Sequence, residues 1–218
     1  MRAPARLLTL VLVLGTPLAA CRGVYYSTME TFGVHKREIL VDRVEDGRDA
    51  QAEAKEEFES ALEHFQAVAG FDGGDLEDLY GRLKKDLSRC EDRVEDVRDR
   101  IDSIETVSED LFDEWEEEIE QIQSPDLSRR SEESLAQARA RYTDLIAAMK
   151  RAERKMEPVL VSFRDHVLFL KHNLNAQAIA SLQGSLFQIE TDVSDLIREM
   201  EVSIAEADSF LAGMESSE

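Results

Sequence analysis

The strongest constraint on the fold is a heptad pattern that continues without a break from residue 80 to residue 122. Its positions follow one another in steps of three or four and are mostly apolar: Tyr80, Leu83, Leu87, Cys90, Val94, Val97, Ile101, Ile104, Ser108, Leu111, Trp115, Ile119 and Ile122. An apolar repeat of this period over roughly six heptads is typical of coiled coils and elongated helical bundles. The pattern therefore predicts one long helix with Cys90 and Trp115 on its buried face.

Three further segments carry the same periodicity, which predicts three more amphipathic helices. The first seam is Leu40, Val44, Gly47, Gln51, Ala54, Phe58, Ala61, Phe65 and Val68. The third is Leu135, Ala138, Tyr142, Leu145, Met149, Ala152, Met156, Val159, Phe163, Val167 and Leu170. The last is Ile179, Leu182, Leu186, Ile189, Val193, Leu196, Met200, Ile204, Ala207 and Leu211. Pro158 lies inside the third seam, whose phase continues past it, so we expect a kink there and not a helix end.

Short breaks separate these seams. Three glycines at 70, 73 and 74 end the first helix, Ser124 and Pro125 open the third as N-cap and first residue, and a polar break at 172–175 precedes the fourth. Breaks this short force neighbouring helices to run antiparallel. We expect an all-α fold, an elongated antiparallel four-helix bundle over residues 38–213, with helices near 38–70, 75–123, 125–172 and 175–212. Residues 214–218 are expected to form a frayed tail.

Cys90 and Trp115 are the two seam residues that could carry more than packing. No histidine or second thiol is placed to join Cys90, so the sequence favours a buried, inert thiol over a redox or metal ligand. A buried Trp115 is a core anchor, whereas an exposed Trp115 would be a candidate for binding a partner.

The charge balance excludes some functions. The chain has a formal net charge of −21, and 33% of its residues are charged, yet 43% are hydrophobic, so extended disorder is not expected. A surface this acidic is repelled by phosphates, which argues against nucleic acid as a partner.

An acidic block at residues 109–120 contains eight carboxylates. The third helix begins with Arg129, Arg130, Arg139 and Arg141, and antiparallel pairing is expected to bring the two groups of charges side by side and help fix the register. A site for a divalent cation on the acidic block is the alternative, although charge runs on helices are usually solvated.

The first 21 residues follow the pattern of a secretory signal, with two arginines, an apolar run at 7–14 and a small-residue cleavage site. The run is too short for a stop-transfer helix. Leu18-Ala19-Ala20-Cys21 resembles the lipobox of bacterial lipoproteins. The resemblance implies that residues 1–20 are removed and that Cys21 carries a diacylglyceryl thioether and an acylated amino terminus. The mature chain would have 198 residues and, having lost two arginines and no acid, a charge of −23.

The residue after Cys21 also bears on location. It is Arg22 and not the aspartate that marks retention in the inner membrane in lipoproteins of this type, so the resemblance implies the periplasmic face of the outer membrane. Residues 21–37 would then be a lipid-anchored tether. Within it, residues 24–32 present Tyr25, Met29 and Phe32 on one helical face, which either lies among lipid headgroups or packs on the base of the bundle.

The chain lacks the motifs of common enzymes. It has no glycine-rich phosphate loop with a lysine, no Gly-x-Ser-x-Gly elbow and no His-Glu-x-x-His sequence. Its four histidines, at positions 35, 64, 166 and 172, never stand four residues apart. We therefore expect a chain that is not an enzyme and that has no cofactor and no catalytic or metal-binding residues.

Three strings resemble a known family: residues 34–65, the FDGGDLEDLY sequence at 71–80, and residues 170–211. They are similar to an uncharacterised family of proteobacterial lipoproteins that share a domain of unknown function. Some members are labelled DNA-repair ATPases, but this chain has no nucleotide-binding loop. We expect an acidic envelope scaffold or adaptor that is held to the membrane through Cys21 and binds a periplasmic protein. The alternative is a carrier or sensor for a small apolar ligand or a divalent cation on the bundle.

Overall fold

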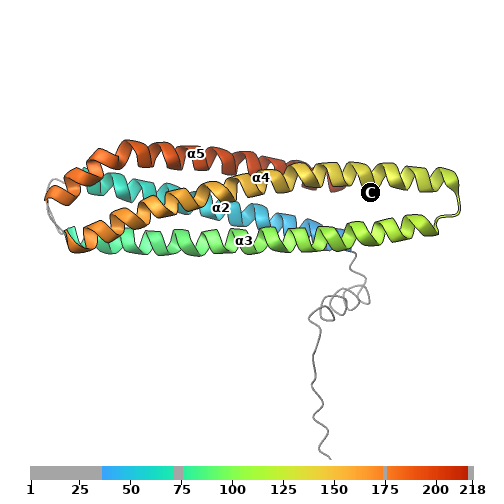
Figure 1. Cartoon of the computed structure of the whole chain (residues 1–218), viewed down its shortest axis with the longest axis horizontal. Coiled ribbons are helices and arrows are strands. Elements are labelled where there is room, and N and C mark those ends of the chain that lie inside the picture. The colour runs from blue at the N-terminus through green and yellow to red at the C-terminus, as the bar shows by residue number, and fades with distance from the viewer. Residues whose placement is uncertain (1–35, 71–75, 174–175, 216–218) are drawn as a thin grey trace, which may run out of the picture. The chain divides into compact units, whose positions relative to one another are not determined.

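The computed structural model describes residues 36–70, 76–173 and 176–215, and these residues form four α-helices (Figure 1). Helix α2 spans Lys36–Ala69, α3 spans Leu76–Gln121, α4 spans Pro125–His172 and α5 spans Ala176–Glu215. These bounds differ from the predicted ones by at most three residues, and the predicted all-α antiparallel four-helix bundle is confirmed. The signal segment, Cys21 and residues 24–32 lie outside the described residues. No described helix combines the length and apolar character needed to cross a bilayer.

Ion pairs between α3 and α4 show the antiparallel register of these two helices. Arg98 of α3 donates to Glu153 of α4 at 2.9 Å, and Arg164 further along α4 donates to Glu91 further back on α3 at 2.6 Å. These side chains are largely exposed, and such pairs stabilise a protein by about 1 kcal/mol or less. They therefore help to set the register, while the core supplies most of the stability.

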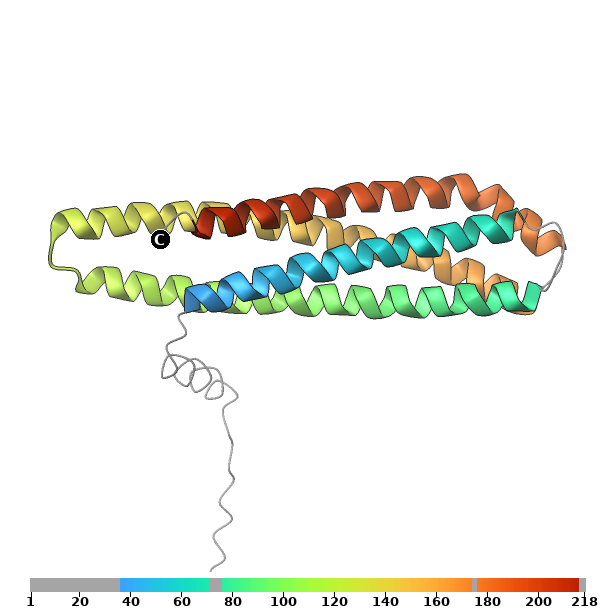
Figure 2. The same cartoon turned by 180° about the vertical axis from the view of Figure 1, so that it is seen from behind.

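Helix α2 lies between α3 and α5 (Figures 1 and 2). On one side Arg89 of α3 pairs with Glu57 at 2.8 Å, and on the other Lys55 pairs with Glu201 of α5 at 2.8 Å. Because α4 packs against both α3 and α5, the four helices close around one core.

The core follows the predicted seams. Every seam residue of α2 is buried, and the largest fully buried side chains include Phe58, Phe65 and Phe163. Gly47 lies at the polar middle of the α2 seam, where a Cβ atom would stand 2.8 Å from both Ile104 Cδ1 and Met149 Cε. The ends of the Ile104 and Met149 side chains therefore fill the space that a side chain at Gly47 would take, so the gap in the apolar pattern is packed by neighbouring helices.

Two local predictions on α4 concern Pro158 and the start of the helix. Helix α4 continues through Pro158, as expected from the unbroken phase. Ser124 is the N-cap residue and Pro125 begins the helix, but the Ser124 side chain makes no capping hydrogen bond. Its carbonyl instead accepts the first helical hydrogen bond, from the backbone N–H of Ser128 at 2.9 Å. The predicted N-cap and first residue of this helix are thus confirmed.

Helices α3 and α4 extend past the start of α2 and the end of α5 (Figures 1 and 2). We call residues 111–141, which include this two-helix extension and the level where α2 begins, the tip. Phe112, Ile119 and Leu135 form a small buried cluster there, with Trp115 and other partly buried side chains packed against it. The tip is therefore held by contacts of α3 with α4, without the second pair of helices that covers the rest of the seams.

Candidate functional site

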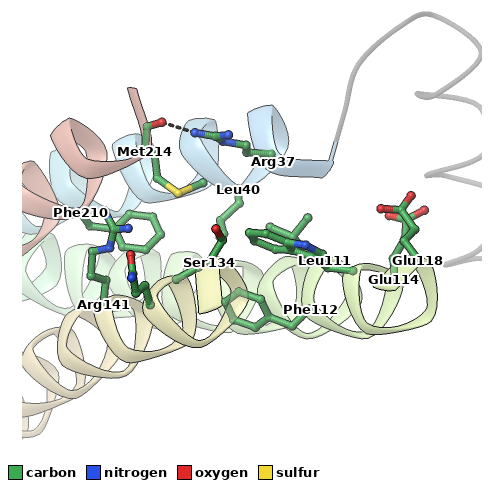
Figure 3. Close-up of a pocket in the computed structure, with 13 residues that line it drawn as sticks. Arg37, Leu40, Leu111, Phe112, Glu114, Glu118, Ser134, Arg141, Phe210 and Met214 are labelled. Atoms are coloured by element: carbon green, nitrogen blue, oxygen red, sulfur yellow. Dashed lines mark hydrogen bonds between the residues drawn. The ribbon is translucent and has the colours of Figure 1, made fainter. Parts of the chain in front are cut away.

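An apolar pocket of about 280 Å³ opens where the four-helix bundle becomes the two-helix tip (Figure 3). Its apolar lining comes from all four helices: Leu40, Leu111, Phe112, Trp115, Ala138, Phe210 and Met214. The pocket exists because α2 begins and α5 ends at this level, so their backbones no longer cover the seams of α3 and α4.

Two arginines that line this pocket bind the end of α5. Arg37 of α2 donates to the carbonyl of Met214 (Figure 3), and Arg141 of α4 donates to the carbonyl of Gly213 at 3.1 Å. The last carbonyls of a helix have no partner within the helix and carry partial negative charge, so guanidinium groups there satisfy and stabilise the end of α5. Both arginines are thus used to fix the rim of the pocket.

Trp115 is partly buried, between the two alternatives that the sequence left open. Its indole N–H donates to the Ser131 hydroxyl of α4 at 2.9 Å, while its ring lines the pocket. The hydrogen bond holds the ring against α4 with one surface toward the pocket. Trp115 is therefore both a packing residue of the tip and a candidate contact for a ligand or partner.

Fewer ion pairs join the acidic block to the arginines of α4 than the sequence predicts. Arg139 pairs across the helices with Glu116 and lies over the Phe112 ring at 5.4 Å. Arg129 and Arg130, in contrast, pair with Asp126 inside α4 at 2.8 and 3.1 Å. The expected contact of the two charge groups is therefore made at Arg139, and for Arg129 and Arg130 the expectation is wrong because a carboxylate of their own helix lies nearer.

Two carboxylates of α3 line the outer side of the pocket. Glu114, which is partly buried, and Glu118, which is exposed, lie next to each other at the end away from Phe210 and Met214 (Figure 3). The site combines an apolar floor with an anionic rim, which suits an occupant that is apolar on one side and cationic on the other.

Cys90 lies on the buried seam as predicted, with no exposed surface. Burial is the main reason that the pKa of its thiol is raised above the usual value, and the nearby charges of Glu57 and Asp86 raise that pKa further. The thiolate is the reactive form, so this environment favours an inert side chain.

We expect a thiol reagent to leave Cys90 unmodified in the native chain, over a time in which it fully modifies the denatured chain. The Cys21→Ser variant makes Cys90 the single thiol, so that mass spectrometry reports on it alone. Rapid modification without denaturant would contradict the buried register of α3.

A polar cluster that the sequence analysis missed joins α2 to α3 beside Cys90. The Asp86 side chain is only 2% exposed, and its two oxygens face His64 Nδ1 at 2.8 Å and an Arg89 guanidinium nitrogen at 2.5 Å. Arg89 also donates to Glu57 at 2.8 Å. Asp86 stands one residue before the seam position Leu87, and only the register of α2 against α3 shows that it is enclosed. Its partners are themselves partly exposed, and the contacts between α2 and α3 help to fix the helix register.

Replacing Asp86 with alanine is expected to lower the free energy of unfolding by about 1–3 kcal/mol, because hydrogen bonds to a charged group are lost. Chemical denaturation followed by circular dichroism measures the change. Asp92→Ala is the matched control, since Asp92 is exposed on the same helix and its loss should cost about 0.5 kcal/mol or less. Equal effects of the two substitutions would show that water replaces the Asp86 contacts.

No group of three or more histidine, cysteine, aspartate or glutamate side chains able to hold a metal ion occurs among the described residues. His64 pairs with Asp86, and His166 lies edge-on to Phe65 with ring centroids 6.3 Å apart. Burial lowers the pKa of His166, so the neutral ring is favoured there. The structure thus places these two histidines in different packing contacts.

Comparison with known proteins adds one result. A family model described as "Protein of unknown function (DUF2959)" matches residues 25–214. The chain belongs to this family. Neither a curated protein nor a solved structure matches it. Membership of the DUF2959 family confirms the expected relation to a family of unknown function, and the match includes nearly all of the four helices. The predicted lipid anchor stays a prediction.

Proposed function

We propose that this DUF2959 protein is a non-enzymatic scaffold or adaptor of the bacterial envelope that binds another protein through its tip. The observation that carries the proposal is the pocket beside Trp115, where four helices give way to two and an apolar floor meets two carboxylates. Partly exposed aromatic side chains in apolar pockets are the usual anchors of protein interfaces. The acidic surface argues against nucleic acid and anionic lipid as the occupant.

The proposal includes a location in the cell envelope. The secretory pattern and the lipobox-like sequence at Cys21 support attachment by acyl chains to the periplasmic face of the outer membrane. A lipid-anchored chain would present the four-helix bundle to periplasmic proteins. The bundle would serve as a rigid support for the tip.

A carrier or sensor of a small apolar ligand is the second candidate, and the same pocket favours it. A cavity of about 280 Å³ is close to the lower end of the range typical for small-molecule sites, about 300–1,000 Å³. Leu40 and Phe210, both nearly fully buried, give it an apolar inner wall. Such a ligand would fill the pocket without needing the rest of the tip.

Native mass spectrometry of the chain, extracted from its own envelope in mild detergent, distinguishes the two candidates. A retained protein supports the scaffold, whereas a retained small molecule of matching mass supports the carrier. Ser134→Trp, which places a large ring in the pocket lining, should release either occupant. Ser181→Trp on an exposed part of α5 is the matched control and should release neither. Retention of a protein by both variants would show that it binds away from the tip.

A further inference from the structure

The faces of α3 and α4 that α2 and α5 cover along most of the bundle are uncovered at the tip. Within the bundle the seam residues Ser108 and Leu145 are 1% and 0% exposed. One and two turns beyond Ser108, Leu111 and Trp115 of α3 are only partly buried, and Leu127 of α4, about five turns from Leu145, is 56% exposed. Apolar seam residues thus continue beyond the helices that would bury them.

The uncovered face of α4 continues from the pocket toward the end of the tip. On α4, Leu127, Ser131, Ser134 and Ala138 recur at helical spacing and so share one face, and Ser134 and Ala138 line the pocket. The side chains after Leu127 are small, which lets a helix approach α4 closely, while Trp115 supplies a large apolar surface on α3. We call this surface the tip groove, comprising Leu111, Trp115 and Glu118 of α3 and Leu127, Ser134 and Ala138 of α4.

Charge determines which helix fits. The tip contains nine acidic and four basic side chains, a net charge of −5. Three of the four arginines pair with carboxylates of the tip, and the fourth, Arg141, is bound to the end of α5. Among the carboxylates of the tip, Glu114 and the exposed Glu118 line the pocket that forms part of the groove. A second copy would bring an equal negative charge to this surface and an anionic lipid would be repelled, so neither matches it.

We propose that the tip groove binds a basic amphipathic helix of a second protein. The apolar face of that helix packs on Trp115 and the small residues of α4, on the faces of α3 and α4 that α2 and α5 do not cover. Its lysines or arginines lie beside the carboxylates of α3. This inference rests on the scaffold proposed above and specifies the chemistry of its partner.

Titration with a model helix tests the inference. The probe is an 18-residue peptide without tryptophan, with leucines on one face and lysines on the other, added to the full chain in nanodiscs of zwitterionic lipid. Trp115 is the only tryptophan of the chain, so its fluorescence reports on the groove alone. We expect the emission to shift to shorter wavelength as the indole loses water, with an affinity that falls as salt is added. A peptide with glutamates in place of the lysines should produce no shift.

Charge variants supply the matched control. The double substitution Glu114→Gln and Glu118→Gln should weaken peptide binding by about tenfold or more, because it removes the carboxylates that line the pocket and leaves the apolar floor. Glu56→Gln and Glu59→Gln remove the same charge from an exposed face of α2 and should leave binding unchanged. Circular dichroism verifies that both variants keep the fold.

Two results would overturn the inference. One is equal weakening by the two double variants or equal binding of the acidic peptide, which would make the interaction nonspecific. The other is an indole that is already shielded in the free chain and does not respond to peptide, which would mean that something else occupies the groove. If a protein is still retained in native mass spectrometry in either case, the scaffold stands and its partner is not a basic helix.

Discussion

Replacing Phe163 with alanine is expected to lower the free energy of unfolding by about 3–5 kcal/mol, the usual cost of truncating a buried aromatic side chain. Phe163 of α4 has no exposed surface and stacks on Phe65 of α2, with ring centroids 4.5 Å apart and an angle of 21° between the rings. The ring of Phe58, two helical turns before Phe65 on α2, lies 6.1 Å from that of Phe163. The substitution removes the ring shared by both contacts and leaves a cavity at the centre of the bundle. Chemical denaturation followed by circular dichroism measures the loss.

Phe187→Ala provides the matched control on α5. The Phe187 side chain is 79% exposed, so its removal should change the free energy of unfolding by about 0.5 kcal/mol or less. A comparable loss in both variants would mean that Phe187 is covered in solution, for example by another protein. An unchanged midpoint for Phe163→Ala would contradict the packing of α4 on α2.

The aromatic cluster also shows how far heptad phase alone predicts this structure. Phe58 and Phe65 were placed on the first seam and Phe163 on the third from spacing only, and all three are buried. A helical repeat predicts which face of a helix is apolar, and short turns predict that neighbouring helices are antiparallel. Together these two facts determine the core of a bundle whose helices are all long.

Prediction from heptad phase fails at the tip, because the phase of one helix does not show where a neighbouring helix ends. Leu111 and Trp115 continue the seam of Ile104 and Ser108 without a change of phase, yet they are only partly buried. Their exposure depends on the level at which α2 begins and α5 ends, which is set by the register of four helices. Sequence analysis therefore identified Trp115 as a candidate but missed the pocket beside it.

Asp86 shows a second limit of prediction from the sequence. Its position next to the seam is that of an ordinary exposed charge, but in the structure His64 and Arg89 enclose it and it is almost fully buried. Contacts of this kind join residues that are 22 positions apart, so only the register between helices shows them. Polar groups at the edges of a core are consequently harder to predict than the apolar residues at its centre.

Changing Cys21 to alanine is expected to abolish lipid attachment, because the lipobox-like sequence assigns all acyl chains to this residue. Two or more acyl chains bind a bilayer stably, whereas one chain binds it only marginally. The acidic bundle should not compensate, since anionic lipid repels it. Growth with radiolabelled palmitate followed by membrane fractionation measures both modification and location. Ser27→Ala, a small substitution after the proposed cleavage site, is the control and should keep the label.

The Cys21→Ala chain has two expected fates, and both lack the label. An uncleaved signal would hold the precursor at the inner membrane, and cleavage by another peptidase would release a soluble periplasmic protein. An unlabelled wild-type chain, or an alanine variant that still reaches the outer membrane, would disprove the lipid anchor. Residues 24–32, with Tyr25 and Phe32, would then become the candidate membrane contact, because an apolar helical face next to basic residues binds the lipid interface without a covalent lipid.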